Sequence, residues 1–225
     1  MRLFFITITS VFILFTSCNE APTKEIKQAS EAIILTKKDP YLLIGEKNFL
    51  TGYEPIYSDG DINVVIEIPT GTVDKWEVNK ETGNMNWEFR NGEPRKVKYL
   101  GYPGNYGMIP KTILPKKLGG DGDPLDVIVL GPPVNRGSVV KAKLIGVLKL
   151  LDNGEQDDKL IAVMTKTPFY NANSLNELDQ QFNGVTRILE TFFSNYKGPG
   201  QMKSLGLADE KEAKKVLNYA IEAYK

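Results

Sequence analysis

The densest group of chemically reactive side chains in the chain is three carboxylates within six residues, Asp121-Gly122-Asp123-Pro124-Leu125-Asp126. Carboxylates this close repel one another, so a fold that gathers them needs a compensating cation, and Mg²⁺ takes oxygen ligands of this kind. The glycines permit a tight loop, and the β-branched run of residues 127–130 suits a buried strand. The segment predicts a metal site at the mouth of a strand, although taken alone such a segment is more often a solvated acidic turn.

A second acidic stretch, residues 152–159, lies between two apolar runs and contains Asp152 and Asp157. By itself it is typical of a solvated hairpin turn, but paired with the first stretch it could close a site for several metal ions. Glu67 stands in an otherwise apolar run, where an unpaired carboxylate is expensive to bury. It belongs either to the same site or to the surface of an edge strand.

Cationic and phenolic side chains accompany these carboxylates. They lie near turns or acidic residues at Lys75, Arg90, Tyr102, Tyr106, Lys159, Tyr196, Lys197 and Lys203. Each is ordinary alone, but together with the carboxylates they describe a pocket for metal ions and a multiply charged anion, most simply a phosphate compound. The chain has no GxxxxGK[ST] loop, which argues against a nucleotide triphosphatase of that kind.

Composition narrows the chemistry further. The 225 residues contain no His, which excludes His-ligated zinc, His general bases and Ser-His-Asp triads. The only Cys is Cys18, so neither an intrachain disulfide nor a cysteine metal cluster forms. Lys plus Arg and Asp plus Glu are balanced at 28 each, so nothing in the bulk charge indicates a nucleic-acid partner. The chemistry must depend on carboxylates, Lys, Arg, Tyr and the metals they hold.

The beginning of the chain resembles a bacterial lipoprotein signal. Residues 1–17 run from Arg2 through an apolar stretch to small residues, which is the order of a secretory signal peptide and too short a span for a transmembrane helix. Cys18 follows where such proteins are lipidated. We therefore expect a signal peptide over residues 1–17, then a lipidated Cys and polar tether over 18–30. The exported protein would be anchored in a bacterial cell envelope, on the periplasmic side or the cell surface, by lipid alone. The alternative is a cleaved signal with an incidental Cys.

The remaining pattern predicts an extension over residues 31–60 that packs on a catalytic domain over 61–225. Strand-like runs occupy residues 62–69, 75–79, 86–90, 127–130, 138–151 and 160–164. Residues 75–79 and 86–90 form a hairpin that places Lys75 and Glu77 on one face, with Trp76 and Val78 on the other.

Other segments complete the expected architecture. Residues 101–110, rich in Gly, Tyr and Pro, are expected to be a loop, and apolar residues at helical spacing indicate helices over residues 175–193 and 208–224. Gly198-Pro199-Gly200 separates the two helices. The pattern predicts an α+β fold, a small closed or nearly closed β-barrel with flanking helices.

The collinear order of several motifs resembles the family I soluble inorganic pyrophosphatases. The resemblance covers residues 61–203 and rests on the acidic segment of residues 121–126 together with Val64-Val65-Ile66-Glu67-Ile68-Pro69, Lys75-Trp76-Glu77, Tyr102-Pro103-Gly104-Asn105-Tyr106-Gly107, Asp152, Asp157, Lys159 and Phe192-Phe193-Ser194-Asn195-Tyr196-Lys197. It implies a five-stranded barrel of the oligonucleotide-binding type and Mg²⁺-dependent hydrolysis of inorganic diphosphate to two phosphates.

The resemblance also implies a role for each matched residue. Several Mg²⁺ ions would be held by Asp121, Asp126, Asp152, Asp157, Glu67 and Glu77. Asp123 would accept the proton of a metal-bridged water, and Tyr106 would take part in catalysis. The two phosphoryl groups would be bound by Lys75, Arg90, Tyr106, Lys159, Tyr196 and Lys197, with Tyr102 and Lys203 in support. Because residues 91–98 look like a short insertion, Arg95 could take the place of Arg90.

Three other functions compete with this one. A binding module would use the acidic loops as a structural Ca²⁺ site beside a nucleic-acid face, but the bulk charge is not basic and Pro124 breaks the spacing of an EF-hand loop. A phosphohydrolase could act on a larger phosphate ester or polyphosphate. A degenerate enzyme could serve attachment, although every matched acidic position is still acidic. The sequence leaves open whether the chain forms a homo-oligomer.

Overall fold

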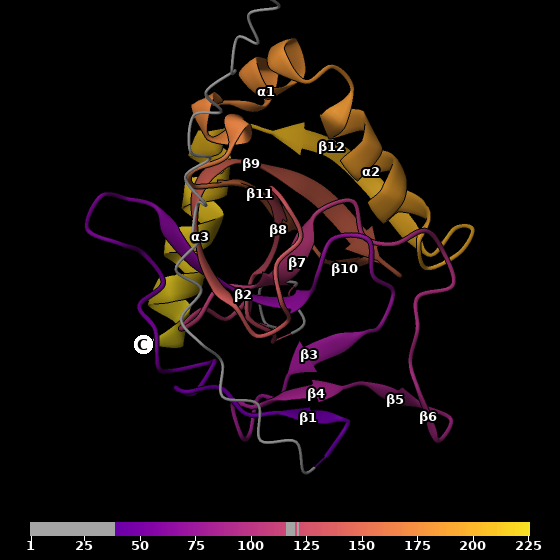
Figure 1. The fold of residues 1–225 in the computed structure, drawn as a ribbon. Helices are drawn as coiled ribbons and strands as arrows, with labels where there is room; N and C mark the ends of the chain where they lie inside the picture. Colours follow the sequence, from indigo (N-terminus) through magenta and orange to yellow (C-terminus); the bar gives the residue numbers. More distant parts are fainter. Residues whose placement is uncertain (1–38, 116–119, 121) are drawn as a thin grey trace, which may run out of the picture.

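Five strands close into a ring, and this barrel is the centre of the fold (Figure 1). The computed structural model describes residues 39–115, 120 and 122–225. Neighbours around the ring are β2 (Ile62–Ile68), β7 (Asn105–Met108), β8 (Asp126–Leu130), β11 (Lys159–Met164) and β9 (Val139–Asp152), which pairs again with β2. Only β8 and β11 run parallel to each other. The predicted closed barrel in an α+β fold is confirmed.

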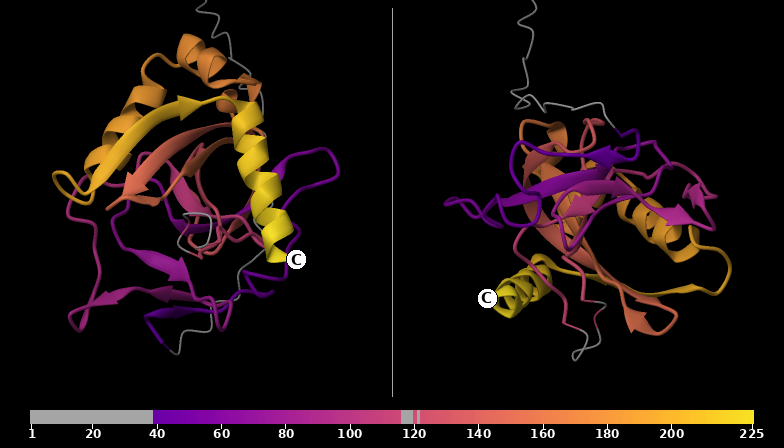
Figure 2. Two further views of the ribbon diagram at one scale, coloured as in Figure 1. Left: turned by 180° about the vertical axis from the view of Figure 1, so that it is seen from behind. Right: turned by 90° about the horizontal axis from the view of Figure 1, so that it is seen from below.

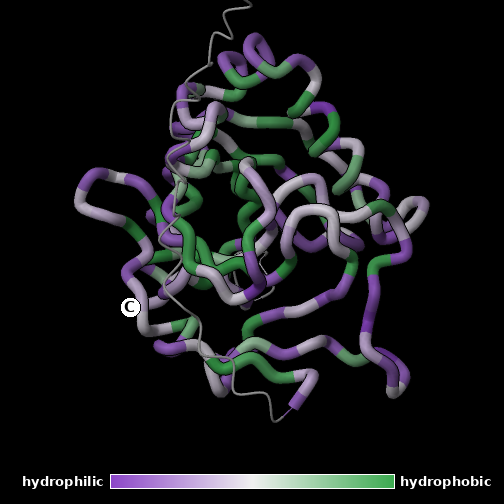
Figure 3. Tube along the Cα trace, viewed as in Figure 1, coloured by the Kyte–Doolittle hydropathy of each residue, from purple (hydrophilic) through white to green (hydrophobic). Residues whose placement is uncertain are grey.

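The barrel strands are buried on both faces. In β11, Leu160 and Ala162 belong to one apolar core, while Ile161 and Val163 belong to a second core on the opposite face. Successive side chains of a strand point to opposite faces, so a continuous apolar run is what a strand with cores on both sides requires. Figure 3 shows the apolar stretches concentrated around the ring.

Helices cover the two sides of the barrel (Figures 1 and 2). The helix α2 (Val185–Asn195) lies beside strand β12 (Met202–Ala208), and α3 (Glu210–Tyr224) contacts β9. Leu189, Phe192 and Phe193 of α2 enter the first core, whereas Leu217 of α3 enters the second. Amphipathic spacing in the sequence therefore corresponds to helices that each bury one face.

The first predicted helix is broken in two. Helix α1 (Leu175–Gln181) ends before Gly184, whose φ of 85° is left-handed, and α2 starts directly after that glycine. A left-handed residue cannot continue a right-handed helix, so the uninterrupted helix over residues 175–193 is wrong. Asp209 caps α3 by accepting from the Glu212 N–H at 3.0 Å, so this helix starts at Glu210 rather than at Ala208.

Three other elements differ from the predicted pattern. The expected loop over residues 101–110 contains β7, because pairing with β2 and β8 imposes strand geometry on residues of weak strand propensity. Strand β12 was not predicted and pairs antiparallel with β9. The acidic stretch after β9 turns at residues 153–154 into the short strand β10 (Glu155–Gln156), which pairs back onto β9. A single-turn 3₁₀ helix, Pro168–Asn171, follows β11.

An outer sheet lies beside the barrel (Figure 1). Its strands, in spatial order, are β1 (Leu42–Leu43), β4 (Met85–Trp87) and β3 (Trp76–Val78), and it continues into a hairpin of β5 (Phe89–Arg90) and β6 (Glu93–Pro94). The predicted hairpin with its turn at residues 80–83 is confirmed, although its second strand is interrupted at Glu88. Phe49, from the segment before the barrel, is buried with Trp76 and Met85 in a third core, to which Val65 of β2 and Met108 of β7 also belong.

Several predicted features lie outside the described residues. These are the signal peptide over residues 1–17, the lipidated Cys18 and its tether, the first part of the extension up to residue 38, and Asp121. In the part of the chain that the structure describes, no helix has the length and apolar character needed to cross a membrane.

Candidate active site

Lys159 joins the two acidic stretches at one end of the barrel. Its ammonium lies 2.5 Å from Asp126 Oδ2 and also contacts Asp157 Oδ1. The parallel register that sets Leu160 beside Val127 brings Lys159 next to Asp126 although the two are 33 residues apart. Burial opposes charge on both groups, but their mutual attraction outweighs it, so the pKa of Lys159 lies well above its usual value and that of Asp126 below. Sequence elements predicted separately thus meet at one buried cation.

Lys197 closes the same cluster from the end of α2. Its Nζ lies 2.5 Å from Asp152 Oδ2 and 3.5 Å from Asp157 Oδ2. Asp157 Oδ2 is buried and accepts no hydrogen bond from any described residue, which leaves this carboxylate oxygen with capacity for a cationic ligand. Asp152 and Asp157 therefore face the first acidic segment across two lysines.

Glu67 is buried at the end of β2, with 4% of its surface exposed, so the alternative of a surface residue on an edge strand is wrong. Its Oε1 accepts a hydrogen bond of 2.7 Å from the Val78 N–H of the outer sheet. Burial raises the pKa of Glu67 to about 8, and the nearby carboxylates of Asp126 and Glu77 add to this, while Lys75 acts in the opposite direction. A carboxyl in this state binds either a proton or a metal cation.

Lys75 and Glu77 lie on one face of the β3 segment, as the predicted alternation requires. Their charged groups are 3.7 Å apart, while Trp76 and Val78 pack into the core behind them. Burial alone would lower the pKa of Lys75, but Tyr102, Glu67 and other acidic groups outweigh burial and raise it. The Lys75 side chain therefore stays protonated and places a positive charge beside Glu67 and Glu77.

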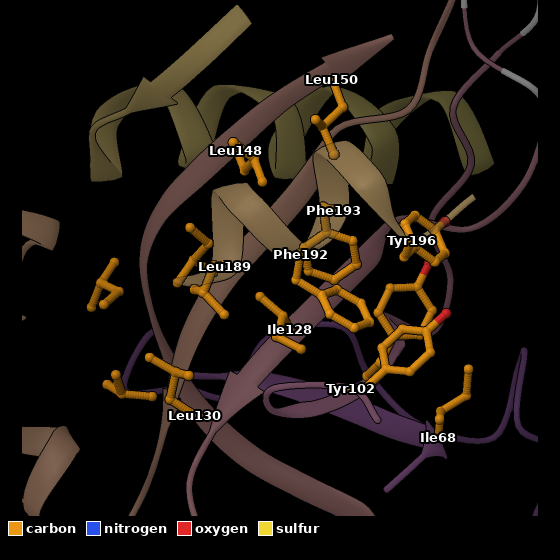
Figure 4. Close-up of a cluster of buried hydrophobic side chains, with 14 of the residues drawn as sticks. Ile68, Tyr102, Ile128, Leu130, Leu148, Leu150, Leu189, Phe192, Phe193 and Tyr196 are labelled. Carbon is orange, nitrogen blue, oxygen red and sulfur yellow. The ribbon is translucent and has the colours of Figure 1, made fainter. Parts of the chain in front are cut away.

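Three tyrosines form the apolar wall of the site. The ring centroids of Tyr102 and Tyr106 are 5.1 Å apart, and Tyr196 stacks on Phe192 at 5.5 Å. In Figure 4 the hydroxyl oxygens of Tyr102 and Tyr196 lie on the same side of this buried cluster. Burial raises the pKa of each, to about 12 for Tyr196. The phenols therefore stay protonated at neutral pH and can act as hydrogen-bond donors.

A cleft of about 750 Å³ opens beside this cluster. It is lined by residues of the β5–β6 hairpin and the segment after it, together with Asp152, Asn153, Tyr196, Lys197 and Gln201. Arg90 and Arg95 both line it, but Arg95 is held by Glu88 at 2.5 Å, whereas Arg90 makes no ion pair in the described part of the chain. Lys203, predicted as a supporting residue, is exposed on β12 and does not line the cleft.

Asp123 lies in a loop held by the backbone. Its main-chain carbonyl accepts from the Leu114 N–H at 2.8 Å, and Thr112 Oγ1 accepts from the Leu125 N–H at 3.0 Å. Its carboxylate contacts the ammonium of Lys80, from the turn of the outer sheet. Sequence reasoning did not include Lys80, because a lysine in a polar turn carries no local signal of such a contact.

Comparison with known proteins identifies the family. The model of the family described as "Inorganic pyrophosphatase" matches residues 64–225. The chain belongs to this family. The inorganic pyrophosphatase of Gluconobacter oxydans is 39% identical over 172 residues, which cover 73% of this chain and 92% of the relative. That of Halalkalibacterium halodurans is 38% identical over 168 residues, with 73% and 95% covered. A solved structure of the Helicobacter pylori inorganic pyrophosphatase matches with a TM-score of 0.65 and 32% identity, over 76% of this chain and 98% of that one.

The residues of this pyrophosphatase fit a divalent cation. Within the described residues no three acidic side chains already form a tight metal cage, and Asp121 lies outside them. Two carboxyl groups nevertheless have room for a cation, because Asp157 has a buried oxygen without a hydrogen bond in the described part of the chain and burial raises the pKa of Glu67. Both features correspond to oxygen ligands that a hard cation would satisfy.

Proposed function

We infer that this chain hydrolyses inorganic diphosphate to two phosphates and that it requires Mg²⁺. The observation that supports this function best is the meeting of Asp126 and Asp157 on the buried Lys159, next to a cleft lined by cations. Diphosphate carries several negative charges within a few ångströms, so its binding needs both metal ions and fixed protein cations. An all-carboxylate site without His suits Mg²⁺ better than zinc.

The metal ligands would come from both acidic stretches and from two strands beside them. The candidates are Asp121, Asp126, Asp152, Asp157, Glu67 and Glu77. When bound, Mg²⁺ would act as a Lewis acid that lowers the pKa of the attacking water and neutralises charge on phosphate oxygens.

The protein's own groups then bind and orient the substrate. Lys75, Lys159 and Lys197 place positive charges around the phosphoryl groups, which favours the transition state because these charges are held in position before reaction. Tyr106 and Tyr196 donate hydrogen bonds from phenols that stay protonated. Asp123 accepts the proton of the attacking water.

Phosphate release from diphosphate tests this function directly. The chain lacking residues 1–18 should release phosphate with Mg²⁺ and not with a chelator. We expect Asp123→Asn to lower kcat by about 10²- to 10⁴-fold, the usual range for a proton acceptor. Equal or faster turnover of sugar phosphates, nucleotides or polyphosphate would favour the larger-substrate alternative. A folded protein without turnover would contradict the proposal and favour the alternative that the acidic loops are structural ion sites.

We also propose that the enzyme is exported and attached to the bacterial cell envelope through a lipid on Cys18, with diphosphate as its substrate outside the cytoplasm. The proposal rests on the signal-like residues 1–17. Mass spectrometry of the N-terminal peptide from the full chain should find acylated Cys18, and Cys18→Ser should release the protein from the membrane fraction. Membrane attachment that survives Cys18→Ser would contradict the lipid anchor. Sedimentation of the same preparation would show whether the chain forms a homo-oligomer.

A further inference from the structure

Four side chains form a continuous stack from the barrel to the outer sheet. The guanidinium of Arg136 lies 4.6 Å from the centroid of the Trp76 ring. Trp76 and Trp87 stack with centroids 5.5 Å apart and an interplanar angle of 29°, and Lys96 Nζ lies 5.7 Å from the Trp87 ring. Each of the two stacked indoles therefore has a cation near its ring, a contact that the negative potential of the aromatic face favours.

The barrel end of the stack is Arg136, in the loop between β8 and β9. Its Nε donates a hydrogen bond of 2.9 Å to the main-chain carbonyl of Glu67. The next residue, Gly137, donates to the Ile66 carbonyl at 2.7 Å, and the Ile66 N–H donates to the Ser138 carbonyl at 2.9 Å. The loop is thus joined by hydrogen bonds to the end of β2, where Glu67 enters the active site, and Arg136 is held in one place.

The outer end of the stack reaches the hairpin that lines the cleft. Trp87 Nε1 donates to the Arg95 carbonyl at 2.8 Å, and Lys96 pairs with Asp74 at 3.8 Å. The Lys75 N–H also donates to the Arg95 carbonyl, at 3.0 Å. The Arg95 carbonyl oxygen, at the base of the hairpin, therefore accepts hydrogen bonds from both the Trp87 indole and the Lys75 backbone.

Among the described residues, no strand of the outer sheet pairs with a strand of the barrel, so side-chain contacts join the two parts. These contacts include the apolar core that Trp76 shares with Val65 and Met108 of the barrel, and the stack on Arg136. The site is nevertheless divided between the two parts: Asp126 and Lys159 are on the barrel, and Lys75 precedes β3. A displacement of one part against the other by about 1 Å would cost about 10²-fold in rate.

We propose that Arg136 is a positioning residue of the diphosphatase, which sets the outer sheet against the barrel through Trp76 and Trp87. Within the described part of the chain, Arg136 does not line the cleft, and the one group assigned to the reaction with which it forms a hydrogen bond is Glu67, through the main-chain oxygen. Its effect therefore passes through the two indoles and the backbone. The inference rests on the diphosphatase function proposed above.

The two indoles of the stack belong to the only tryptophans in the chain, which provides a direct readout. Coupled indoles give a circular-dichroism signal that depends on their mutual geometry, so the signal reports the stack independently of turnover. Arg136→Met removes the charge and the Nε donor at similar length. Arg136→Lys retains only the charge. Arg187→Met applies the same substitution to an exposed arginine of α2 and serves as the matched control.

We expect Arg136→Met to weaken the indole signal and to lower kcat/KM for Mg²⁺-diphosphate by about 10- to 100-fold, with a rise in KM. Arg136→Lys should recover part of both, and Arg187→Met should change neither. An altered indole signal with unchanged kcat and KM would overturn the inference, as would an unaltered indole signal in Arg136→Met.

A second variant keeps the inference testable if Arg136→Met folds poorly. Trp87→Phe retains ring stacking on Trp76 but loses the hydrogen bond to the Arg95 carbonyl, and we expect it to raise KM by a few-fold. Unchanged KM in Trp87→Phe would contradict the link to the hairpin. A folded wild type that releases no phosphate would contradict the proposed function. An active wild type together with unchanged kcat and KM in Arg136→Met would contradict only the positioning role.

Discussion

The barrel and the outer sheet hold their parts of the site in different ways. On the barrel, Asp126 and Lys159 lie on adjacent parallel strands of a ring closed by backbone hydrogen bonds, and Lys159 is fully buried. On the outer sheet, the strands are only two or three residues long, and Arg90 is exposed to solvent. Buried charges interact strongly because little water screens them, whereas exposed charges interact weakly. Changes at the buried charges of the barrel should therefore abolish function, and changes at the exposed charges of the outer sheet should alter it only in degree.

The largest effect is expected for Lys159→Met. The substitution leaves Asp126 and Asp157 without their shared buried cation, so kcat should fall by about 10³-fold or more and the metal-free protein should lose about 3–5 kcal/mol of unfolding free energy. Chemical denaturation and steady-state assays measure both. Lys149→Met is the matched control, because Lys149 also pairs with a buried carboxylate, Asp158 at 2.8 Å, but reaches toward α3. An active Lys159→Met would refute the central role of this lysine.

A pH titration of stability compares Glu67 of the barrel with Glu77 of the outer sheet. The pKa of Glu67 is raised from 4.5 to about 8 in the folded protein, so the folded state binds the proton more tightly than the unfolded state does. In chelator, the contribution of Glu67 to the unfolding free energy should be fully present below pH 4.5 and should be lost as the pH rises to about 8, by about 5 kcal/mol at most. Glu67→Gln should remove this decline, and Glu77→Gln, at a half-exposed side chain, should retain it. If the pH profile of stability were identical in Glu67→Gln and wild type, the raised pKa of the buried Glu67 carboxyl would be contradicted.

The two arginines beside the cleft should differ. Arg90 is exposed and makes no ion pair in the described part of the chain, so Arg90→Ala should raise KM about tenfold with little change in Tm. Arg95→Ala breaks the contact with Glu88, so it should lower stability by about 1 kcal/mol and affect KM less. If Arg95→Ala raised KM more than Arg90→Ala did, the phosphate contact would belong to Arg95.

The smallest effect is expected at Lys203. Its side chain is exposed on β12 and does not line the cleft, so Lys203→Ala should change kcat and KM by less than about twofold. A tenfold loss would support the role beside the substrate that the family resemblance implies for Lys203.

Local sequence determined much of this protein. The absence of His and of a second Cys restricts the chemistry to carboxylates, amines and phenols. The β-branched runs predict β2, β8, β9 and β11 because such side chains suit a pleated, buried surface, and the alternation of charged and apolar residues predicts β3. Each of these signals depends only on neighbours in the chain.

Tertiary structure decided the remainder. Strand β7 exists because β2 and β8 supply its hydrogen bonds, although its own residues resemble a loop. Asp126 and Lys159 meet only because two strands 33 residues apart run parallel in one register. No sequence pattern around Arg136 predicts its contacts with Glu67 and Trp76. Contacts between residues distant in sequence depend on how the elements pack, and local propensity does not encode that packing.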